Sequence, residues 1–236
     1  GAAPPPALQD LVLGTAPVPR PSDLSEGEVI VRNLWLSLDP AMRGWMDDAK
    51  SYIPPVPLGE VMRGGCVGEV VASRSSKFPL GCLVQGMFGW QEYTRSGPKG
   101  VVRVEPPPGI PASMFLGVLG LTGMTAYFGL LDVGKPVKGE TVVVSAAAGA
   151  TGSVVAQIAK HVIGCHVVGI AGGADKCRWL VDDLGLDAAI DYKDTSAPLA
   201  RRLKETCPRG IDVFFDNVGG DQLDAALTRL ARGARV

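Results

Sequence analysis

A run of small residues, 146–153, has the composition of a turn that binds phosphate. It reads Ala-Ala-Ala-Gly-Ala-Thr-Gly-Ser, and it directly follows the β-branched segment 141–145. That segment is short and apolar enough for a buried parallel strand. Because no bulky side chain intervenes in the turn, its backbone N–H groups can approach an anion closely.

The residues after this turn complete a strand–turn–helix–strand unit. Apolar side chains recur at helical spacing over 154–162, Gly164 ends the helix, and a second strand is predicted at 165–170. A helix that begins at the turn adds the positive end of its dipole to a phosphate site. The glycine pattern alone is A-x-G-x-x-G, with Ala147 in place of the first glycine, so an ordinary turn of small residues is the alternative.

The end of the second predicted strand indicates which nicotinamide cofactor fits. An NAD site usually has Asp or Glu here to accept hydrogen bonds from the ribose hydroxyls, and the segment 170–173, Ile-Ala-Gly-Gly, has neither. Lys176 and Arg178 follow, two cations that could pair with a 2′-phosphate, and Gly173 leaves room for it. The sequence therefore favours NADP(H), the alternative being that both cations are solvated helix residues near Asp175.

The overall composition sets bounds on the class of protein. The chain has 236 residues, 46% of them hydrophobic and 20% charged, which is enough for two modest globular domains. A net charge of −1 provides no basic field for nucleic acid or an anionic membrane. No apolar run approaches the roughly 20 residues of a membrane span, and no signal peptide is recognisable. We expect a cytoplasmic protein that binds neither nucleic acid nor membrane.

Cysteine and histidine usage predicts no metal site. The five cysteines are widely scattered without a C-x-x-C pair, and His161 and His166 are the only histidines. Zinc sites need such ligands at short spacing. We therefore expect no bound metal, and we interpret all five cysteines as core or surface thiols, with Cys66 the one nearest the expected cleft.

The sequence pattern differs between the two halves of the chain. Short alternating runs at 28–38, 68–71 and 82–86, punctuated by Pro and Gly, predict a compact β structure in the amino-terminal half. The pattern becomes helical over 113–131 before the βαβ unit begins. The expected fold class is α/β, with a β-rich domain at 1–115 and a doubly wound parallel domain at 116–236.

Four motifs in this order closely resemble those of one protein family. They are Leu-Ser-Leu-Asp-Pro-Ala-Met-Arg-Gly at 36–44, Leu-Gly-Leu-Thr-Gly-Met-Thr-Ala-Tyr at 119–127, the turn at 146–152, and Phe-Asp-Asn-Val-Gly-Gly at 215–220. The chain is similar to the zinc-independent medium-chain dehydrogenase/reductases. Within them it most resembles the prostaglandin reductase and leukotriene hydroxydehydrogenase group, which includes plant alkenal double-bond reductases and bacterial curcumin reductase. The resemblance extends over 29–236.

This resemblance implies an NADPH-dependent reduction of a carbon–carbon double bond conjugated to a carbonyl. The reaction would take place between a GroES-like β domain and a Rossmann domain, in a homodimer. A hydride goes to the β-carbon, charge collects on the carbonyl oxygen as an enolate, and a proton reaches the α-carbon. The expected substrate is a small enone of the alkenal or 15-oxoprostaglandin type. A quinone reductase and a non-catalytic NADPH-binding protein are the alternatives.

The same resemblance assigns the cofactor contacts. Lys176 and Tyr192 would contact the 2′-phosphate and its surroundings, and Asn217 would lie beside the cofactor at the end of its strand. The alternative interpretations are a surface aromatic for Tyr192 and a turn former for Asn217. The pyrophosphate would be held by Gly149, Ala150, Thr151 and Gly152. The positions near the nicotinamide would be Thr122, Met124 and Thr125, of which Met124 suits a core position equally well.

The chain departs from the family pattern at two places. Ala41 stands where many relatives have tyrosine, which predicts a wider pocket there, while Asp39 and Arg43 nearby are expected to form an ion pair. The sequence also stops at Val236 as another strand begins, whereas family members continue. We expect the later strands of the sheet, and the tyrosine often assigned to the enolate oxygen, to lie beyond Val236. No catalytic residue is therefore named within the chain.

Overall fold

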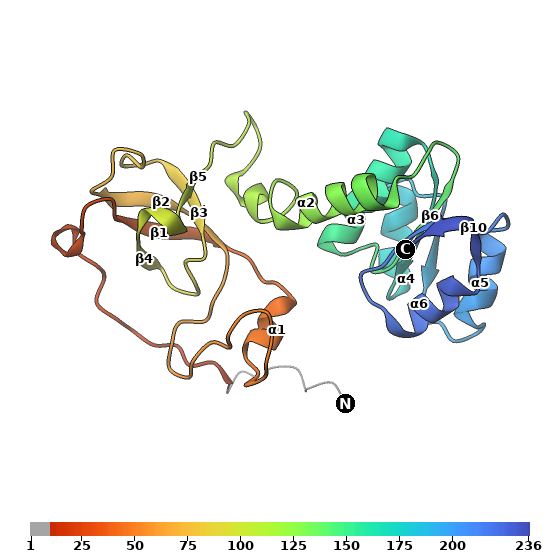
Figure 1. Cartoon of the computed structure of the whole chain (residues 1–236), viewed down its shortest axis with the longest axis horizontal. Coiled ribbons are helices and arrows are strands. Elements are labelled where there is room, and N and C mark those ends of the chain that lie inside the picture. The colour runs from red at the N-terminus through yellow and green to blue at the C-terminus, as the bar shows by residue number, and fades with distance from the viewer. Residues whose placement is uncertain (1–9) are drawn as a thin grey trace. The chain divides into compact units, whose positions relative to one another are not determined.

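Residues 10–236 are described by a computed structural model, which divides at Leu116 and Gly117 into two compact units (Figure 1). The Pro-rich start at 2–6, where the sequence shows no clear first strand, lies outside the described residues.

The first unit is built on a five-stranded antiparallel sheet in the order β4-β1-β2-β3-β5. Side chains alternate along β1, so that Val29 and Val31 enter the main core while Ile30 packs on the other face against Leu24 and Ala72. At the start of this strand both faces are thus covered by apolar residues, whereas its later residues are more exposed. The strands are β1 (Val29–Leu36), β2 (Cys66–Ser73), β3 (Leu83–Gly86), β4 (Tyr93–Ser96) and β5 (Val102–Arg103).

The short helix α1 (Ala41–Trp45) follows the first motif, and its ion pair differs from the expected one. Arg43 pairs with Asp47 at 2.7 Å, one helical turn ahead. The carboxylate of Asp39 instead accepts a hydrogen bond from the Ser37 hydroxyl at 3.0 Å. The predicted Asp39–Arg43 pair is therefore wrong. Both carboxylates lie four residues from Arg43, but Asp39 is engaged in the turn that precedes the helix, whereas Asp47 follows on the helical side.

The helix expected over 113–131 is broken in the structure. A 3-10 turn spans Ala112–Leu116, the chain folds back, and α2 begins only at Leu121. Gly123 explains the break, because its N–H reaches the Gly117 carbonyl at 3.2 Å and a Cβ atom there would lie 1.8 Å from the Val118 oxygen. Helix α2 (Leu121–Phe128) then widens into a π-helical stretch that ends at Gly134.

The second unit is a five-stranded parallel sheet in the order β10-β9-β6-β7-β8. Strand β6 is fully buried, as its β-branched composition predicts. The strands are β6 (Thr141–Val144), β7 (His166–Ala171), β8 (Ala188–Asp191), β9 (Ile211–Phe215) and β10 (Leu230–Arg235). The crossing helices are α3 (Ala150–Gln157), α4 (Ala174–Arg178), α5 (Leu199–Thr206) and α6 (Gly220–Leu227).

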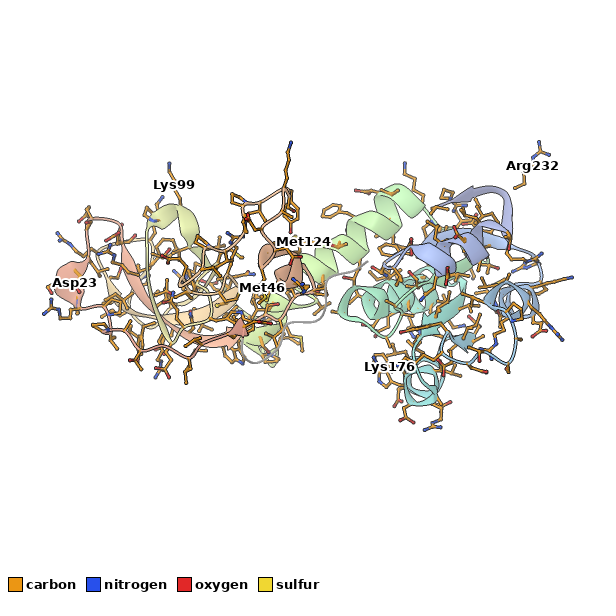
Figure 2. All side chains as sticks on the ribbon, turned by 90° about the horizontal axis from the view of Figure 1, so that it is seen from below. Asp23, Met46, Lys99, Met124, Lys176 and Arg232 are labelled. Atoms are coloured by element: carbon orange, nitrogen blue, oxygen red, sulfur yellow. The ribbon has the colours of Figure 1, made fainter. Side chains whose placement is uncertain are left out.

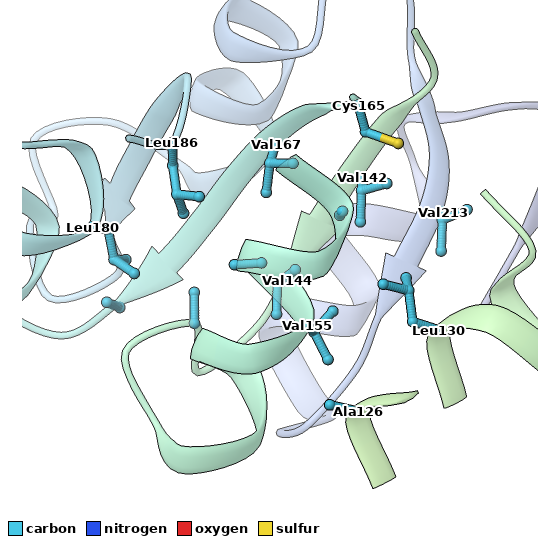
Figure 3. Packing of buried hydrophobic residues seen from close by; sticks show 14 residues of the cluster. Ala126, Leu130, Val142, Val144, Val155, Cys165, Val167, Leu180, Leu186 and Val213 are labelled. Atoms are coloured by element: carbon cyan, nitrogen blue, oxygen red, sulfur yellow. The ribbon is translucent and has the colours of Figure 1, made fainter. Parts of the chain in front are cut away.

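Helices cover both faces of this sheet. Figure 3 shows Val142 and Val144 of β6 packed with Ala126 of α2 and Val155 of α3. Val143, pointing the other way, joins a second cluster with Leu203 of α5 and other residues. Each such buried valine contributes about 1.5–3 kcal/mol relative to an exposed one. The structure confirms the α/β class, with an antiparallel GroES-like sheet and a parallel Rossmann-like sheet.

Among residues 10–236 no helix combines the length and the apolar character needed to cross a bilayer.

Arg235 fastens the last strand to the loop that precedes the first strand of the parallel sheet. Its guanidinium donates to the carbonyls of Gly134 and Lys135, at 2.8 and 3.0 Å, and to both carboxylate oxygens of Glu140, at 3.0 and 2.5 Å. Glu140 also accepts from the Val137 N–H at 2.9 Å. The Arg235 guanidinium lowers the pKa of Glu140 below its ordinary value of 4.5.

Replacement of Glu140 by Gln should therefore lower the free energy of unfolding at pH 7 by about 1–2 kcal/mol. A lowered carboxyl pKa stabilises the fold above 4.5 and loses that effect as the pH falls through the folded-state pKa, so the loss should shrink below pH 4. Urea titrations at several pH values measure this. Glu205→Gln, which breaks an exposed pair with Arg201, is the control and should cost about 0.5 kcal/mol or less. A Glu140→Gln deficit that is equal at pH 7 and pH 3 would contradict this prediction.

Candidate functional site

The parallel sheet reverses its winding between β6 and β9, which is where ligands bind in open α/β sheets. The loops that leave the carboxyl ends of these two strands are tied together. Oδ1 of Asp216 accepts hydrogen bonds from the Ser145 hydroxyl at 2.8 Å and from the N–H groups of Val218 and Gly219 at 3.0 Å each. Although burial opposes this, the bonds lower the pKa of Asp216 below its ordinary value.

Asn217 completes this connection. Its backbone N–H donates to the Ser145 hydroxyl at 2.7 Å, and its side-chain Nδ2 donates to the Ser145 carbonyl at 2.8 Å. The side-chain amide of Asn217 therefore connects the loop after β9 to the loop after β6. Sequence reasoning missed Ser145 and Asp216, because their contact spans 71 residues and no local pattern announces it.

The small-residue turn after β6 forms a tight cradle at the start of α3. Helix α3 begins at Ala150, and its N-cap Gly149 has no side chain that could cap the first turn. A Cβ atom on Gly152 would lie 2.4 Å from the Ala146 oxygen, so only glycine lets the helix come this close to the turn. The N–H groups of a helix's first turn have no partner within the helix, and they carry the positive end of its dipole. Thr151 lies in the same turn.

This geometry passes a test of fit for a dinucleotide pyrophosphate, since the backbone amides of an uncapped helix start lie beside residues that lack bulky side chains. The turn itself is fixed by two hydrogen bonds, from Ala147 N–H to the Ile170 carbonyl at 3.0 Å and from Gly149 N–H to the Ala146 carbonyl at 2.8 Å. An anion could therefore bind without rearrangement of the backbone.

A second group of predicted residues gathers at the carboxyl ends of β7 and β8. The ring of Tyr192, about half exposed, lies against Gly172, where a Cβ atom would come within 3.0 Å of the ring. Gly173 adopts φ 100° and precedes α4, which carries Lys176 at the surface (Figure 2). Across residues 10–236 no side chain or carbonyl engages the Lys176 ammonium.

Arg178 is placed differently from Lys176. Its guanidinium pairs with the Asp175 carboxylate one helical turn back, so that Asp175 neutralises this cation and not its neighbour. Lys176 and Arg178 are both exposed on α4, as the alternative interpretation of solvated helix residues expects, and they differ in that only Arg178 is paired with Asp175.

Asp191 is a residue of this region to which sequence reasoning gave no role of its own. Oδ1 of its carboxylate accepts from the N–H groups of Gly173 at 2.8 Å and Lys193 at 2.9 Å. The bond from Gly173, followed by that from Lys193, lowers the pKa of this carboxyl below its ordinary value of 3.8. The bond to Lys193 is an Asx turn that an aspartate at a strand end could have signalled, but the bond to Gly173 depends on the pairing of β7 with β8.

The three predicted nicotinamide positions, Thr122, Met124 and Thr125, lie on α2, and in the described part of the chain none of their side chains forms a hydrogen bond with the turn after β6. The Thr125 hydroxyl donates to the Leu121 carbonyl at 2.8 Å, within its own helix. The hydroxyl of Thr122 is buried without a hydrogen-bond partner among residues 10–236. Met124 is half exposed and outside the core of its unit, so the core interpretation of this residue is wrong.

Three further features bear on the chemistry. Within the described part of the chain, no cluster of three or more His, Cys, Asp or Glu side chains could hold a metal ion. Cys66 is buried in the first unit, and burial raises the pKa of its thiol to about 11. In the same unit an apolar cavity of about 310 Å³ is lined by Met42, Met46, Met62 and Trp90, among others.

Comparisons with known proteins match both units. The family model described as "N-terminal domain of oxidoreductase" matches residues 4–104, and that described as "Zinc-binding dehydrogenase" matches residues 150–236. The chain is 48% identical over 211 residues to NADPH-dependent curcumin reductase of Escherichia coli, which covers 89% of this chain and 60% of that protein. It is 42% identical over 233 residues to prostaglandin reductase 1 of Bos taurus, with 98% and 67% covered.

A solved structure agrees with these relatives. The crystal structure of CurA from Vibrio vulnificus in complex with NADPH superimposes with a TM-score of 0.88 at 46% identity, over 97% of this chain and 66% of that one. The chain thus spans about two thirds or less of the length of the proteins that it matches.

Replacement of Gly152 by Val should push the start of α3 away from the turn, because the new Cβ would lie 2.4 Å from the Ala146 oxygen. We expect NADPH and NADH to lose affinity by the same factor, about tenfold or more, since both carry the pyrophosphate. Fluorescence titration measures both dissociation constants. The control is Gly97→Val, where an added Cβ meets nothing within 4 Å. Unchanged binding by Gly152→Val would show that this turn is not the phosphate site.

Proposed function

This chain belongs to the zinc-independent medium-chain dehydrogenase/reductases, in the group of the curcumin and prostaglandin reductases, and we propose that it reduces enones with NADPH. The substrate class would be α,β-unsaturated ketones and aldehydes, reduced at the carbon–carbon double bond. The observation that carries the proposal is the arrangement of residues at the carboxyl edge of the parallel sheet. There the glycine cradle lies at the start of α3. Directly after β7, where an NAD site would have a carboxylate, the sequence is Gly-Gly, and Lys176 follows it in α4 with no partner among residues 10–236.

The residues of the second unit divide the binding of NADPH between them. The backbone of Gly149, Ala150, Thr151 and Gly152 holds the pyrophosphate at the helix start, where the dipole favours negative charge. Lys176 supplies a cation to the 2′-phosphate, and the Tyr192 ring over Gly172 forms a wall beside it. Gly173 leaves the space between them open, since a Cβ there would meet nothing within 4 Å.

Asn217, Thr122, Met124 and Thr125 are assigned to the nicotinamide half. Asn217 follows β9 at the switch point, and its side chain is fixed by the Ser145 carbonyl. The unpartnered Thr122 hydroxyl is a donor and acceptor that a ligand could engage. Met124 offers a half-exposed apolar side chain.

When bound, NADPH supplies the hydride that adds to the β-carbon of the enone. The chain orients the cofactor through two fixed loops, one after β6 and one after β9. Because the cofactor is already oriented when the substrate binds, less orientational entropy is lost in reaching the transition state. The enolate oxygen that forms needs a hydrogen-bond donor, and the α-carbon needs a proton. No residue among 10–236 is assigned to these last two roles.

A homodimer is proposed on the family resemblance alone. The domain bounds 1–115 and 116–236 rest on the change of sequence pattern, and the cytoplasmic location rests on composition. Sedimentation velocity would decide the oligomeric state, a monomer at micromolar concentration being the contrary result.

The reaction is tested by following nicotinamide absorbance after an enone or a quinone is added to the protein with NADPH. Decay with the enone only is the expected result. Decay with the quinone only would make the protein a quinone reductase, and NADPH binding without decay in either case would make it a non-catalytic binding protein.

Replacement of Lys176 by Ala tests the choice of cofactor. We expect the dissociation constant of NADPH to rise about tenfold or more, as for a lost hydrogen bond to a charged group, with that of NADH nearly unchanged. Arg178→Ala is the matched control, because its guanidinium is already paired with Asp175, and should have a much smaller effect. Equal losses for the two cofactors in Lys176→Ala would remove the 2′-phosphate role.

A further inference from the structure

A single carboxylate oxygen joins the two loops that carry the proposed 2′-phosphate contacts. Oδ1 of Asp191 accepts from Gly173 N–H at 2.8 Å and from Lys193 N–H at 2.9 Å. Gly173 immediately precedes the helix that carries Lys176, while Lys193 immediately follows Tyr192. One atom therefore fixes the chain on both sides of the expected phosphate.

Gly173 needs such a restraint. It is the N-cap of α4 at φ 100° and ψ 147°, with no side-chain cap, and a Cβ atom there would meet nothing within 4 Å. No side chain fixes this conformation, and glycine by itself populates many others. The hydrogen bond from its N–H to Asp191 restrains it from the side of β8, and that bond bears on the direction in which the first turn of α4 presents Lys176.

The loop after β8 is held from its other side as well. The Arg202 guanidinium of α5 donates to the Asp191 carbonyl at 2.8 Å and to the Ser196 hydroxyl at 3.2 Å, and it pairs with Asp194. The Asp191 backbone is thus held by Arg202. Its carboxylate in turn holds the Gly173 N–H at the end of the neighbouring strand β7, which pairs with β8.

We propose that Asp191 is a positioning residue for cofactor selection, which holds Lys176 and Tyr192 in the arrangement that receives a 2′-phosphate. This inference rests on the proposed NADPH-dependent function. It assigns to Asp191 an effect on the preference for NADPH over NADH, exerted through the two loops. A merely structural role would weaken the binding of both cofactors alike.

The experiment compares NADPH and NADH dissociation constants, measured by fluorescence, for the wild type and three variants of the purified protein. Asp191→Ala removes the oxygen that accepts both hydrogen bonds, and Asp191→Asn keeps a carbonyl oxygen in the same place. Asp187→Ala is the matched control, since this carboxylate accepts from Val167 N–H at 2.7 Å at the opposite end of the same strand pair and also pairs with Lys160. Thermal unfolding of each variant without cofactor separates folding from binding.

We expect Asp191→Ala to lower the preference for NADPH over NADH about tenfold, Asp191→Asn to stay within about threefold of the wild type, and Asp187→Ala to leave the ratio unchanged. In a Lys176→Ala background, Asp191→Ala should change the ratio much less than in the wild type, because the Lys176 contact is already lost and only the arrangement of Tyr192 remains to be disturbed. Should Asp191→Ala fail to fold, Asp191→Ser, whose hydroxyl is too short to reach both amides, is measured instead.

An unchanged ratio in Asp191→Ala, or an equal fall in Asp187→Ala, would overturn the inference. A wild type that binds NADPH and NADH equally would instead overturn the NADPH proposal on which it rests, so the two failures are distinguishable.

Discussion

The close approach of helix α3 to the turn after β6 is the constraint on which the site depends. At Gly152 the helix comes so near that a single Cβ atom would lie 2.4 Å from the Ala146 oxygen. Ala146 itself adopts φ 46°, a left-handed conformation that costs a non-glycine residue about 1–3 kcal/mol. The buried valines of β6 and the helix packing on both sheet faces offset this cost. The core of the unit thus holds the first turn of α3 open toward an anion.

Two aspartates hold the loops at the carboxyl ends of the strands in fixed positions. Asp216 joins the loops after β6 and β9 through Ser145, and Asp191 joins those after β7 and β8 through Gly173. Both accept several hydrogen bonds on one oxygen, and both have a pKa lowered by backbone N–H groups, so that they are ionised at neutral pH. The carboxyl edge of the sheet is therefore fixed at two separate points.

The sequence carried enough information for the sheet and the turn, because their signals are local. The β-branched run at 141–144 and the small residues after it predicted β6 and the start of α3, and the alternating runs predicted β1 to β3. The family resemblance is confirmed by relatives that match nearly the whole chain. Which residues contact a cofactor stays a prediction.

The contacts that the sequence did not reveal are those between distant segments. Helical periodicity over 113–131 could not show that Gly123 packs on the Val118 carbonyl, which breaks the predicted helix. Nor could the sequence show that Asp191 reaches Gly173, 18 residues earlier, because that bond exists only once β7 and β8 pair. The ion pair of Arg43 was assigned to the wrong aspartate, since two carboxylates flank it at helical spacing.

The central claim is that hydride passes from NADPH to the β-carbon of an enone, and isotopic transfer tests it most directly. The protein would be incubated with an enone and NADPH that carries deuterium in both positions at C4 of the nicotinamide, and the product would be examined by NMR. We expect one deuterium at the β-carbon and a solvent proton at the α-carbon. Reduction to an allylic alcohol with deuterium at its carbinol carbon, the former carbonyl carbon, or no transfer despite NADPH binding, would contradict this reaction.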